Sequence, residues 1–354
     1  MSQIKVNAVT DGSGGNTATI NSMTPTADSL QGFRNRIING DMRIDQRNAG
    51  ASVTIATSGT YTLDRWVGWA SPTSKYSIEQ TITGVAAPTG FAEYLGVTSL
   101  SAYSITSGDF FTVNQPIEGF NVADLAWGSA SAKTVTLSFW VRSSLTGTFG
   151  GSVQNNAQNR SYPFTYTISA ANTWEQKSVT IAGDTSGTWG TGNGVGIRLH
   201  IGLGVGSTYS GTAGSWAGTN YLSATGATSV VGTNGATLYI TGVQLEVGSV
   251  ATPFERKDYG RELAMCQRYY YSWSSSGLSD NYYFYSPYVS SPPNTTASVG
   301  YFFPVTMRAN PTMVGTGLTL ARFTANQAGA VAQLGTTSGA TAYSLSAFTA
   351  TAEL

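Results

Sequence analysis

The stretch Val135-Thr136-Leu137-Ser138-Phe139-Trp140-Val141-Arg142 decides the fold, because its side chains separate into two sets with a period of two. Successive side chains of a β-strand point to opposite faces, so one set would form an apolar face and the other would point outward. The same period recurs in Tyr162–Ile168, in Ile197–Leu203 and in Leu238–Val247. Glycine-rich stretches such as 183–196, which are typical of turns, separate these segments.

Many half-buried strands joined by glycine- and serine-rich turns predict an all-β fold, an antiparallel β-sandwich of the jelly-roll type. The alternation in the last of these strands slips at Gly242, which indicates a β-bulge. We expect four parts: an N-terminal attachment arm (1–32), the jelly-roll β-sandwich (33–250), a linker helix (251–272) and a second, smaller C-terminal β domain (273–354).

The linker helix is predicted from a capping signal and a helical period. Thr252-Pro253-Phe254-Glu255 has the form of a capping box with proline at the first helical position. From Tyr259 to Tyr270 the apolar residues recur at helical spacing and form one face. Gly260 weakens the first turn, so the firm part of the helix is expected over 261–271.

Composition excludes several classes of protein. Only 10% of the residues are charged, against about 25% in an average soluble domain, and hydroxyl groups replace charge. The formal net charge is zero, so no nucleic-acid footprint is expected. No apolar run is long enough for membrane insertion, and the first residues do not form a signal peptide. We therefore expect a protein made in a cytoplasm but with the composition of an extracellular β protein.

The sequence gives little support for a catalytic site or a metal site. A single cysteine, Cys266, and a single histidine, His200, exclude an internal disulfide and any site that needs two imidazoles. A serine–histidine–aspartate triad would need His200, which lies in mid-strand. A glycosidase needs only two carboxylates and stays an alternative. Its candidate acids are Asp64, Asp109, Glu118 and Asp124, without supporting spacing. We expect no enzyme activity, no cofactor and no metal site; a structural calcium ion stays open.

Charge is concentrated in two short stretches, 34–47 and 246–268, on either side of the charge-poor strands. Clusters of mixed sign are typical of ion-pair networks or of subunit interfaces, and a plain solvated surface is the alternative. The residues predicted to form an interface are Arg34, Arg36, Asp41, Arg43, Glu255, Arg256, Arg261, Glu262 and Arg268.

Three groups of motifs resemble one family of proteins. The first is Phe33–Met42 with Tyr61–Trp66. The second is Gly242–Gly248 with Ala251–Arg256, Glu262-Leu263 and Cys266–Tyr270. The third is Phe303–Arg308 with Asn310–Thr312. In this order they resemble a family of virion structural proteins of tailed bacteriophages, which comprises tail fibre and minor tail proteins. More loosely, the block from Thr134 to Ile240 resembles the jelly roll of carbohydrate-binding modules.

The resemblance implies a tail fibre or tail-associated protein of the virion, made in the host cytoplasm without a signal peptide. Its N-terminal region would dock on other virion proteins of the tail, baseplate or capsid, and its β domains would contact the host surface. Fibre proteins of this kind commonly close three chains around one axis, so a homotrimer is expected. The alternatives are a capsid decoration or head-fibre protein without a host-binding role, and a glycan depolymerase.

Host glycan is the ligand that the outward-facing residues favour. Sugars stack on aromatic faces while polar side chains hold their hydroxyl groups. If the strands share a sheet, its outer face would carry two aromatic rings and two cationic groups. The predicted residues are Trp140, Arg142, Arg198, His200 and Tyr239. Packing of this face against another subunit is the alternative, and it is favoured by the low charge of the chain, because weakly charged fibres usually self-associate.

Overall fold

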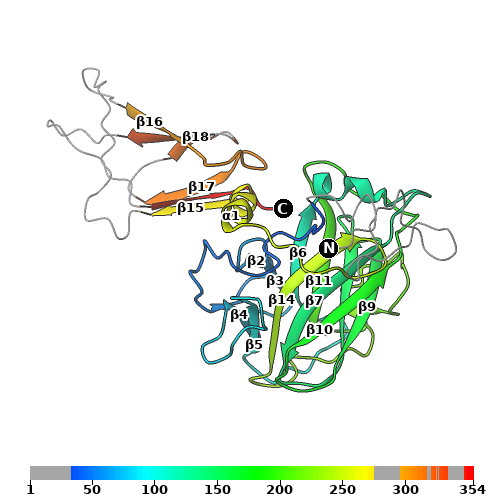
Figure 1. The fold of residues 1–354 in the computed structure, drawn as a ribbon. Coiled ribbons are helices and arrows are strands. Elements are labelled where there is room, and N and C mark those ends of the chain that lie inside the picture. Colours follow the sequence, from blue (N-terminus) through cyan, green and yellow to red (C-terminus); the bar gives the residue numbers. More distant parts are fainter. Residues whose placement is uncertain (1–32, 275–295, 317–319, 324, 326, 334–346) are drawn as a thin grey trace, which may run out of the picture.

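The computed structural model describes residues 33–274, 296–316, 320–323, 325, 327–333 and 347–354. Twelve strands form two antiparallel six-stranded sheets (Figure 1). The first sheet contains, in spatial order, β1 (Val53–Thr54), β4 (Tyr76–Gln80), β5 (Leu95–Ser99), β14 (Thr237–Val247), β7 (Val135–Ser143) and β10 (Glu175–Ile181). The second contains β2 (Thr60–Tyr61), β3 (Val67–Ala70), β6 (Phe110–Glu118), β11 (Val195–Val205), β8 (Gly147–Asn155) and β9 (Ser161–Ile168).

The two sheets enclose one hydrophobic core, which confirms the predicted β-sandwich. Leu137 and Phe139 of β7 and Leu199 and Ile201 of β11 are fully buried in this shared cluster. Burial of each such side chain contributes about 1.5–3 kcal/mol. The chain crosses to the opposite sheet at every step from β5 to β8 and again from β9 to β11 and on to β14, as in a jelly roll.

The bulge predicted in the last sandwich strand is confirmed. The register of β14 against β7 shifts between Thr241 and Gln244, and Gly242 there has a φ of 61°. A Cβ atom at this position would lie 2.6 Å from the ring of Phe91. Glycine satisfies both the left-handed backbone and the close approach.

The predicted start of the helix is wrong. The helix α1 spans Tyr259–Gln267, and its N-cap is Asp258, whose side chain accepts a hydrogen bond from the Arg261 amide at 2.9 Å. The expected capping residues are engaged elsewhere. Thr252 donates through its amide and its hydroxyl to Glu246, and Glu255 accepts from a backbone amide of the N-terminal segment.

Asn39 ties three separate parts of the chain together. Its side-chain amide donates to the carbonyls of Ile44, at 2.8 Å, and Asp64, at 3.0 Å, and its side-chain oxygen accepts from the Ile44 amide. Its carbonyl accepts from the indole of Trp66, and its backbone amide donates to the Glu262 carboxylate of α1. Asn39 is fully buried with a φ of 57°, a conformation that asparagine tolerates better than most residues.

Two three-stranded sheets follow α1, as expected for a second β domain (Figure 1). They are β15 (Tyr270–Ser274), β20 (Ala347–Thr351) and β17 (Thr312–Thr316), and then β16 (Thr296–Phe302), β19 (Gln327–Gln333) and β18 (Leu320–Phe323). A separate apolar cluster that includes Tyr271, Met307 and Phe348 packs on the β15-β20-β17 sheet. The predicted attachment arm, 1–32, lies outside the described residues.

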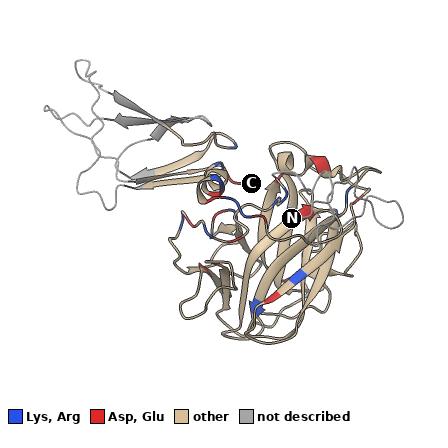
Figure 2. Cartoon of the chain, viewed as in Figure 1, with Lys and Arg blue, Asp and Glu red and all other residues tan. Residues whose placement is uncertain are grey.

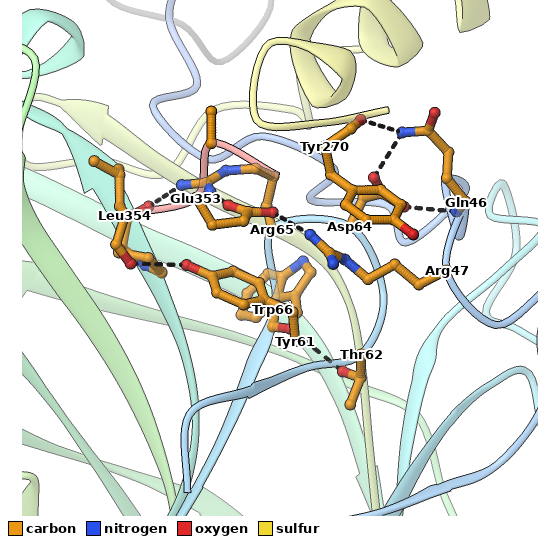
Figure 3. A network of polar contacts seen from close by, with 12 residues as sticks. Gln46, Arg47, Tyr61, Thr62, Asp64, Arg65, Trp66, Tyr270, Glu353 and Leu354 are labelled. Atoms are coloured by element: carbon orange, nitrogen blue, oxygen red, sulfur yellow. Dashed lines mark hydrogen bonds and ion pairs between the residues drawn. The ribbon is translucent and has the colours of Figure 1, made fainter. Parts of the chain in front are cut away.

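The chain after β20 returns to the sandwich through buried ion pairs (Figure 3). The carboxylate of Glu353 pairs with the guanidinium groups of Arg65 and Arg47, the latter at 2.7 Å. The Arg65 side chain is 1% exposed, and its Cζ atom lies 3.7 Å from the centroid of the Tyr269 ring. The pKa of Arg65 is raised by Glu353 against the opposing effect of burial. The sandwich and the C-terminal sheets are therefore joined by a charge cluster.

The two charged stretches meet each other within the chain (Figure 2). Of the residues predicted to form an interface, seven make polar contacts inside this chain, which is the ion-pair alternative. They are Arg34 with Glu246, Arg36 with Asp124, Arg43 with Asp41, Arg268 with Glu118, Glu255 with Asn35, and Glu262 with Asn39. The side chains of Arg256 and Arg261 are exposed. A contact with other chains stays a prediction for these residues.

We predict that Asn39→Ala lowers the free energy of unfolding by about 2–4 kcal/mol, because it removes three side-chain hydrogen bonds and leaves buried groups unpaired. The matched control is Asn172→Ala, an exposed asparagine whose φ is 56°. This control loses only the backbone preference, about 1 kcal/mol. Denaturant unfolding measures both values, and equal losses would contradict the role assigned to the Asn39 side chain.

Candidate functional site

The five residues predicted to bind glycan do not share a sheet. Trp140 and Arg142 lie on β7 and Tyr239 lies on β14, both in the first sheet. Arg198 and His200 lie on β11, in the second sheet. All five belong to the outer faces, as the alternation predicts, but the sandwich core separates the two groups. The single mixed face expected from the sequence is therefore wrong.

On the first sheet, the predicted residues are partly covered by the chain itself. Tyr239 is 5% exposed, and its ring lies 5.1 Å from Tyr94 and 6.4 Å from Trp174, measured between centroids. The indole of Trp174 donates to the Ala86 carbonyl at 2.9 Å, which fixes its position. The Cζ atom of Arg142 lies 5.9 Å from the Tyr239 centroid. This face is thus largely a packed aromatic layer.

On the second sheet, a row of polar side chains crosses the outer face. His200 pairs in register with Asn114 of β6 on one side and with Ser152 of β8 on the other. One pair further along, Arg198 lies opposite Gln154 of β8. Directly opposed residues in antiparallel strands project from the same face, so these side chains lie together. All of them except Arg198 have no exposed surface.

Three buried atoms in this row lack a hydrogen-bond partner within the described residues: the side-chain oxygens of Asn114 and Gln154, and Nε2 of His200. The other ring nitrogen of His200 lies 3.4 Å from the Thr112 hydroxyl. An unpaired polar atom away from water costs about 1–3 kcal/mol, and most such atoms in proteins are satisfied. Three together on one covered face mark a place that favours ordered water beneath the segment that covers the sheet.

His200 is neutral at physiological pH. Burial, and secondarily the positive charge of Arg198, lower its pKa to about 3. A neutral imidazole has one nitrogen that donates and one that accepts, so Nε2 can complement a hydroxyl group in either role. This property suits recognition of hydroxyl groups better than proton transfer near neutral pH.

A cavity of about 270 Å³ lies beside this polar row. Its lining is Ser58, Trp69, Phe110, Gln158, Tyr209, Asn220 and Leu222. Two contacts connect the cavity to the row beneath it. The ring of Trp69 lies 5.4 Å from that of His200, and the Asn220 side chain accepts from Gln154 at 2.6 Å. Asn220 in turn donates to Gln158 at 3.1 Å, so the amide groups form a continuous chain.

The segment between β11 and β14 supplies one wall of the cavity. It contains β12 (Ser210–Gly211) and β13 (Ser223–Ala224), which pair in parallel. A Cβ atom on Gly202 of β11 would lie 2.7 Å from the Ser223 hydroxyl oxygen. Glycine at that position allows this wall to lie directly on the sheet.

Sequence reasoning found Arg198 and His200 but missed Trp69, Asn220 and the other lining residues. The sequence could have placed Trp69 on the outer face of β3, because Trp66 and Gly68 alternate with it and point to the opposite, buried face. Asn220 carried none, because it lies in a long connection whose path over the sheet depends on tertiary packing.

The four acidic residues considered as catalytic candidates are engaged in other contacts. Asp109 accepts hydrogen bonds from Thr106, Tyr103 and Ser71. Glu118 and Asp124 form the ion pairs already described. Asp64 accepts from Gln46, and burial raises the pKa of its carboxyl group to about 6.

Metal-binding clusters and membrane-spanning helices are both absent from the described part of the chain. Within it, no cluster of three or more histidine, cysteine, aspartate or glutamate side chains is arranged to hold a metal ion. In the same residues, no helix combines the length and the apolar character needed to cross a bilayer.

No family model matches the sequence, and no curated protein does. The prediction of a phage virion family therefore rests on the motifs alone. Solved structures give weak similarities. The enzymatically active domain of bacteriophage CBA120 tailspike protein 4 is 12% identical, with a TM-score of 0.33; the match covers 62% of this chain and 22% of that one.

Two carbohydrate-binding modules are similar to the same degree. TmCBM61, solved with β-1,4-galactotriose, is 10% identical with a TM-score of 0.31, over 61% of this chain and 99% of the module. A family 11 module from Clostridium thermocellum, solved with a β-1,3-1,4-mixed-linked tetrasaccharide, is 7% identical with a TM-score of 0.28, over 56% and 97%. The sandwich itself is established independently, by its sheet order and shared core.

Because His200 is the only histidine, its protonation can be followed directly by NMR. We predict that its imidazole proton shifts stay constant between about pH 5 and about pH 8 in the folded protein, and titrate near about 6.5 in urea. Titration near neutral pH in the folded state would contradict its burial.

The lowered pKa of His200 also determines how the free energy of unfolding changes with pH. Between the folded pKa of about 3 and the unfolded value of 6.5, only the unfolded chain binds the proton, so stability is complete above 6.5 and falls as the pH falls. Relative to His200→Gln, the wild type should lose about 3 kcal/mol of unfolding free energy at about pH 4.5.

Proposed function

We propose that this protein binds glycan through the outer face of the β2-β3-β6-β11-β8-β9 sheet, as a structural component of a tailed-phage virion. One observation carries the binding proposal: a cavity lined by aromatic rings and by amide and hydroxyl groups lies beside a buried polar row, to which two contacts connect it. This combination of apolar rings and convergent polar groups is typical of small-molecule sites.

A sugar fits this chemistry on both counts. Its hydroxyl groups donate and accept, which matches the amide groups of Gln158 and Asn220 and the hydroxyl groups of Ser58 and Tyr209 in the lining of the cavity. Its C–H faces suit the rings of Trp69 and Tyr209, which both line the cavity. The volume of about 270 Å³ suits one or two sugar rings of a longer chain rather than a large ligand.

The virion assignment rests on the sequence motifs and on their arrangement in space. Phe33–Met42 hydrogen-bonds to β14 and to α1, through Asn35 and Asn39. Arg308 donates to the carbonyls of Ala352 and Glu353, and so lies in the same junction. Motifs that are distant in sequence but adjacent in the fold are expected of one structural unit. We propose a homotrimer that docks through its N-terminal region and presents the cavity to the host surface without turnover.

Trp69→Ala tests the binding site. On an array of bacterial surface polysaccharides, followed by titration calorimetry with the best ligand, we expect the affinity to fall at least about tenfold. Trp174→Ala, on the outer side of the other sheet, is the control that keeps binding. If Trp140→Ala removed binding while Trp69→Ala did not, the site would lie on the first sheet. A wild type that binds no polysaccharide would contradict the proposal.

Immunogold labelling of intact virions tests the location. We expect label on the tail or its fibres, where contact with the host surface occurs. Label over the head would instead indicate the decoration protein that the sequence left as an alternative. Absence of label, with an epitope shown to be accessible in the purified protein, would contradict the virion assignment.

A further inference from the structure

Arg198 stands beside the proposed site without a counterion among the described residues. It lies on β11 with its side chain partly exposed, and its Cζ atom lies 5.2 Å from the centroid of the Trp69 ring. Its buried Nε atom has no hydrogen-bond partner there, a feature that it shares with six other arginines of the described chain. The hydrogen bond from its Nη2 to the Asn156 side-chain oxygen is 3.5 Å long and therefore weak.

Most other arginines of the described chain are neutralised. The pairs are Arg34–Glu246, Arg36–Asp124, Arg43–Asp41, Arg47–Glu353, Arg65–Glu353, Arg160–Asp184 and Arg268–Glu118. In a chain with zero formal net charge, acidic partners are as numerous as basic ones. None of the described carboxylates forms an ion pair with Arg198. Arg142, Arg256 and Arg308 also form no ion pair among the described residues, but Arg198 differs from them because its guanidinium group lies against Trp69, a ring that lines the cavity.

The surroundings of Arg198 provide no carboxylate among the described residues. Burial lowers the pKa of its guanidinium group, Tyr61 acts to raise that pKa, and the charge of Arg65 acts to lower it. The paired groups beneath, Gln154 and His200, are neutral amide and imidazole. A half-buried cation in neutral surroundings is costly unless an anion approaches it.

The position of Arg198 suits a planar anion. Contact with the Trp69 ring holds the guanidinium plane in place. Its forked donors match a carboxylate or a sulfate with two parallel hydrogen bonds, which a neutral hydroxyl group cannot accept in the same way.

We infer that the ligand of the proposed glycan site is an acidic glycan, an inference that rests on the proposed function. The anionic group of this glycan binds Arg198, and the adjoining sugar ring occupies the cavity beside Trp69. The recognised chemistry is a carboxylate or a sulfate ester on a sugar. Gln158 and Asn220 line the cavity and supply hydrogen bonds to the neutral part of the ligand.

The test is an array of matched oligosaccharides. Uronic acid members are paired with their methyl esters, sialylated members with their carboxyl-reduced forms, and sulfated members with their desulfated forms. We expect at least one acidic member to bind at least about tenfold more tightly than its neutral counterpart, and that preference to weaken with added salt. The pair that shows it separates carboxylate from sulfate.

Three variants then locate the effect. Arg198→Gln should abolish the preference, and Arg198→Lys, which keeps the charge but loses the fork, should retain only part of it. Arg256→Gln is the control, because its guanidinium stacks on Phe91 at 4.8 Å, on the side of the other sheet. Unchanged unfolding midpoints show that the variants fold.

The outcomes separate the inference from the function on which it rests. Equal binding of acidic and neutral members, with loss of both in Trp69→Ala, would overturn the inference and leave the glycan site standing. A preference that survives in Arg198→Gln would also overturn it. Failure to bind any member of the array would overturn both.

Discussion

The carboxamide of Asn39 is the interaction on which the arrangement of the chain depends. A neutral amide both donates and accepts, so one buried side chain can join the N-terminal segment to the turn before β3 with no charge to compensate. The backbone of the same residue binds Trp66 and α1. Asn35 acts similarly on β14, next to the bulge. The strands form the core, and the amide groups of Asn35 and Asn39 fix which segments pack at its edge.

The alternation of residues predicted the faces of the strands but not their sheets. A period of two is a local property of the backbone, so it correctly placed Phe139 and Leu199 inside and Trp140 and Arg198 outside. Which sheet a strand joins depends on pairing with strands distant in sequence. The order β3-β6-β11 brings Trp69 toward His200, and nothing near either residue in the sequence indicates it.

The start of the helix and the candidate site could not be predicted correctly, because both depend on contacts with residues that are distant in the sequence. Thr252 and Glu255 have the residue types of a helix cap, but their side chains hydrogen-bond instead to the carboxylate of Glu246 and to the backbone amide of Asn35. A local motif carries no information about such competitors. In the same way, Arg198 could be recognised as outward-facing, but its lack of a counterion is visible only when every other described charged group has been placed.

The pairing of Arg65 with Glu353 has a consequence for the biogenesis of the protein. The two residues are separated by 288 positions, so the ribosome makes all the strands of the sandwich after β2, and β15–β20, before the buried cation meets its anion. Until then the rim of the sandwich contains an uncompensated charge, which costs several kcal/mol. Closure of so long a loop is slow. Burial of Arg65 in the sandwich is thereby coupled to the synthesis and pairing of β20, the strand that precedes Glu353.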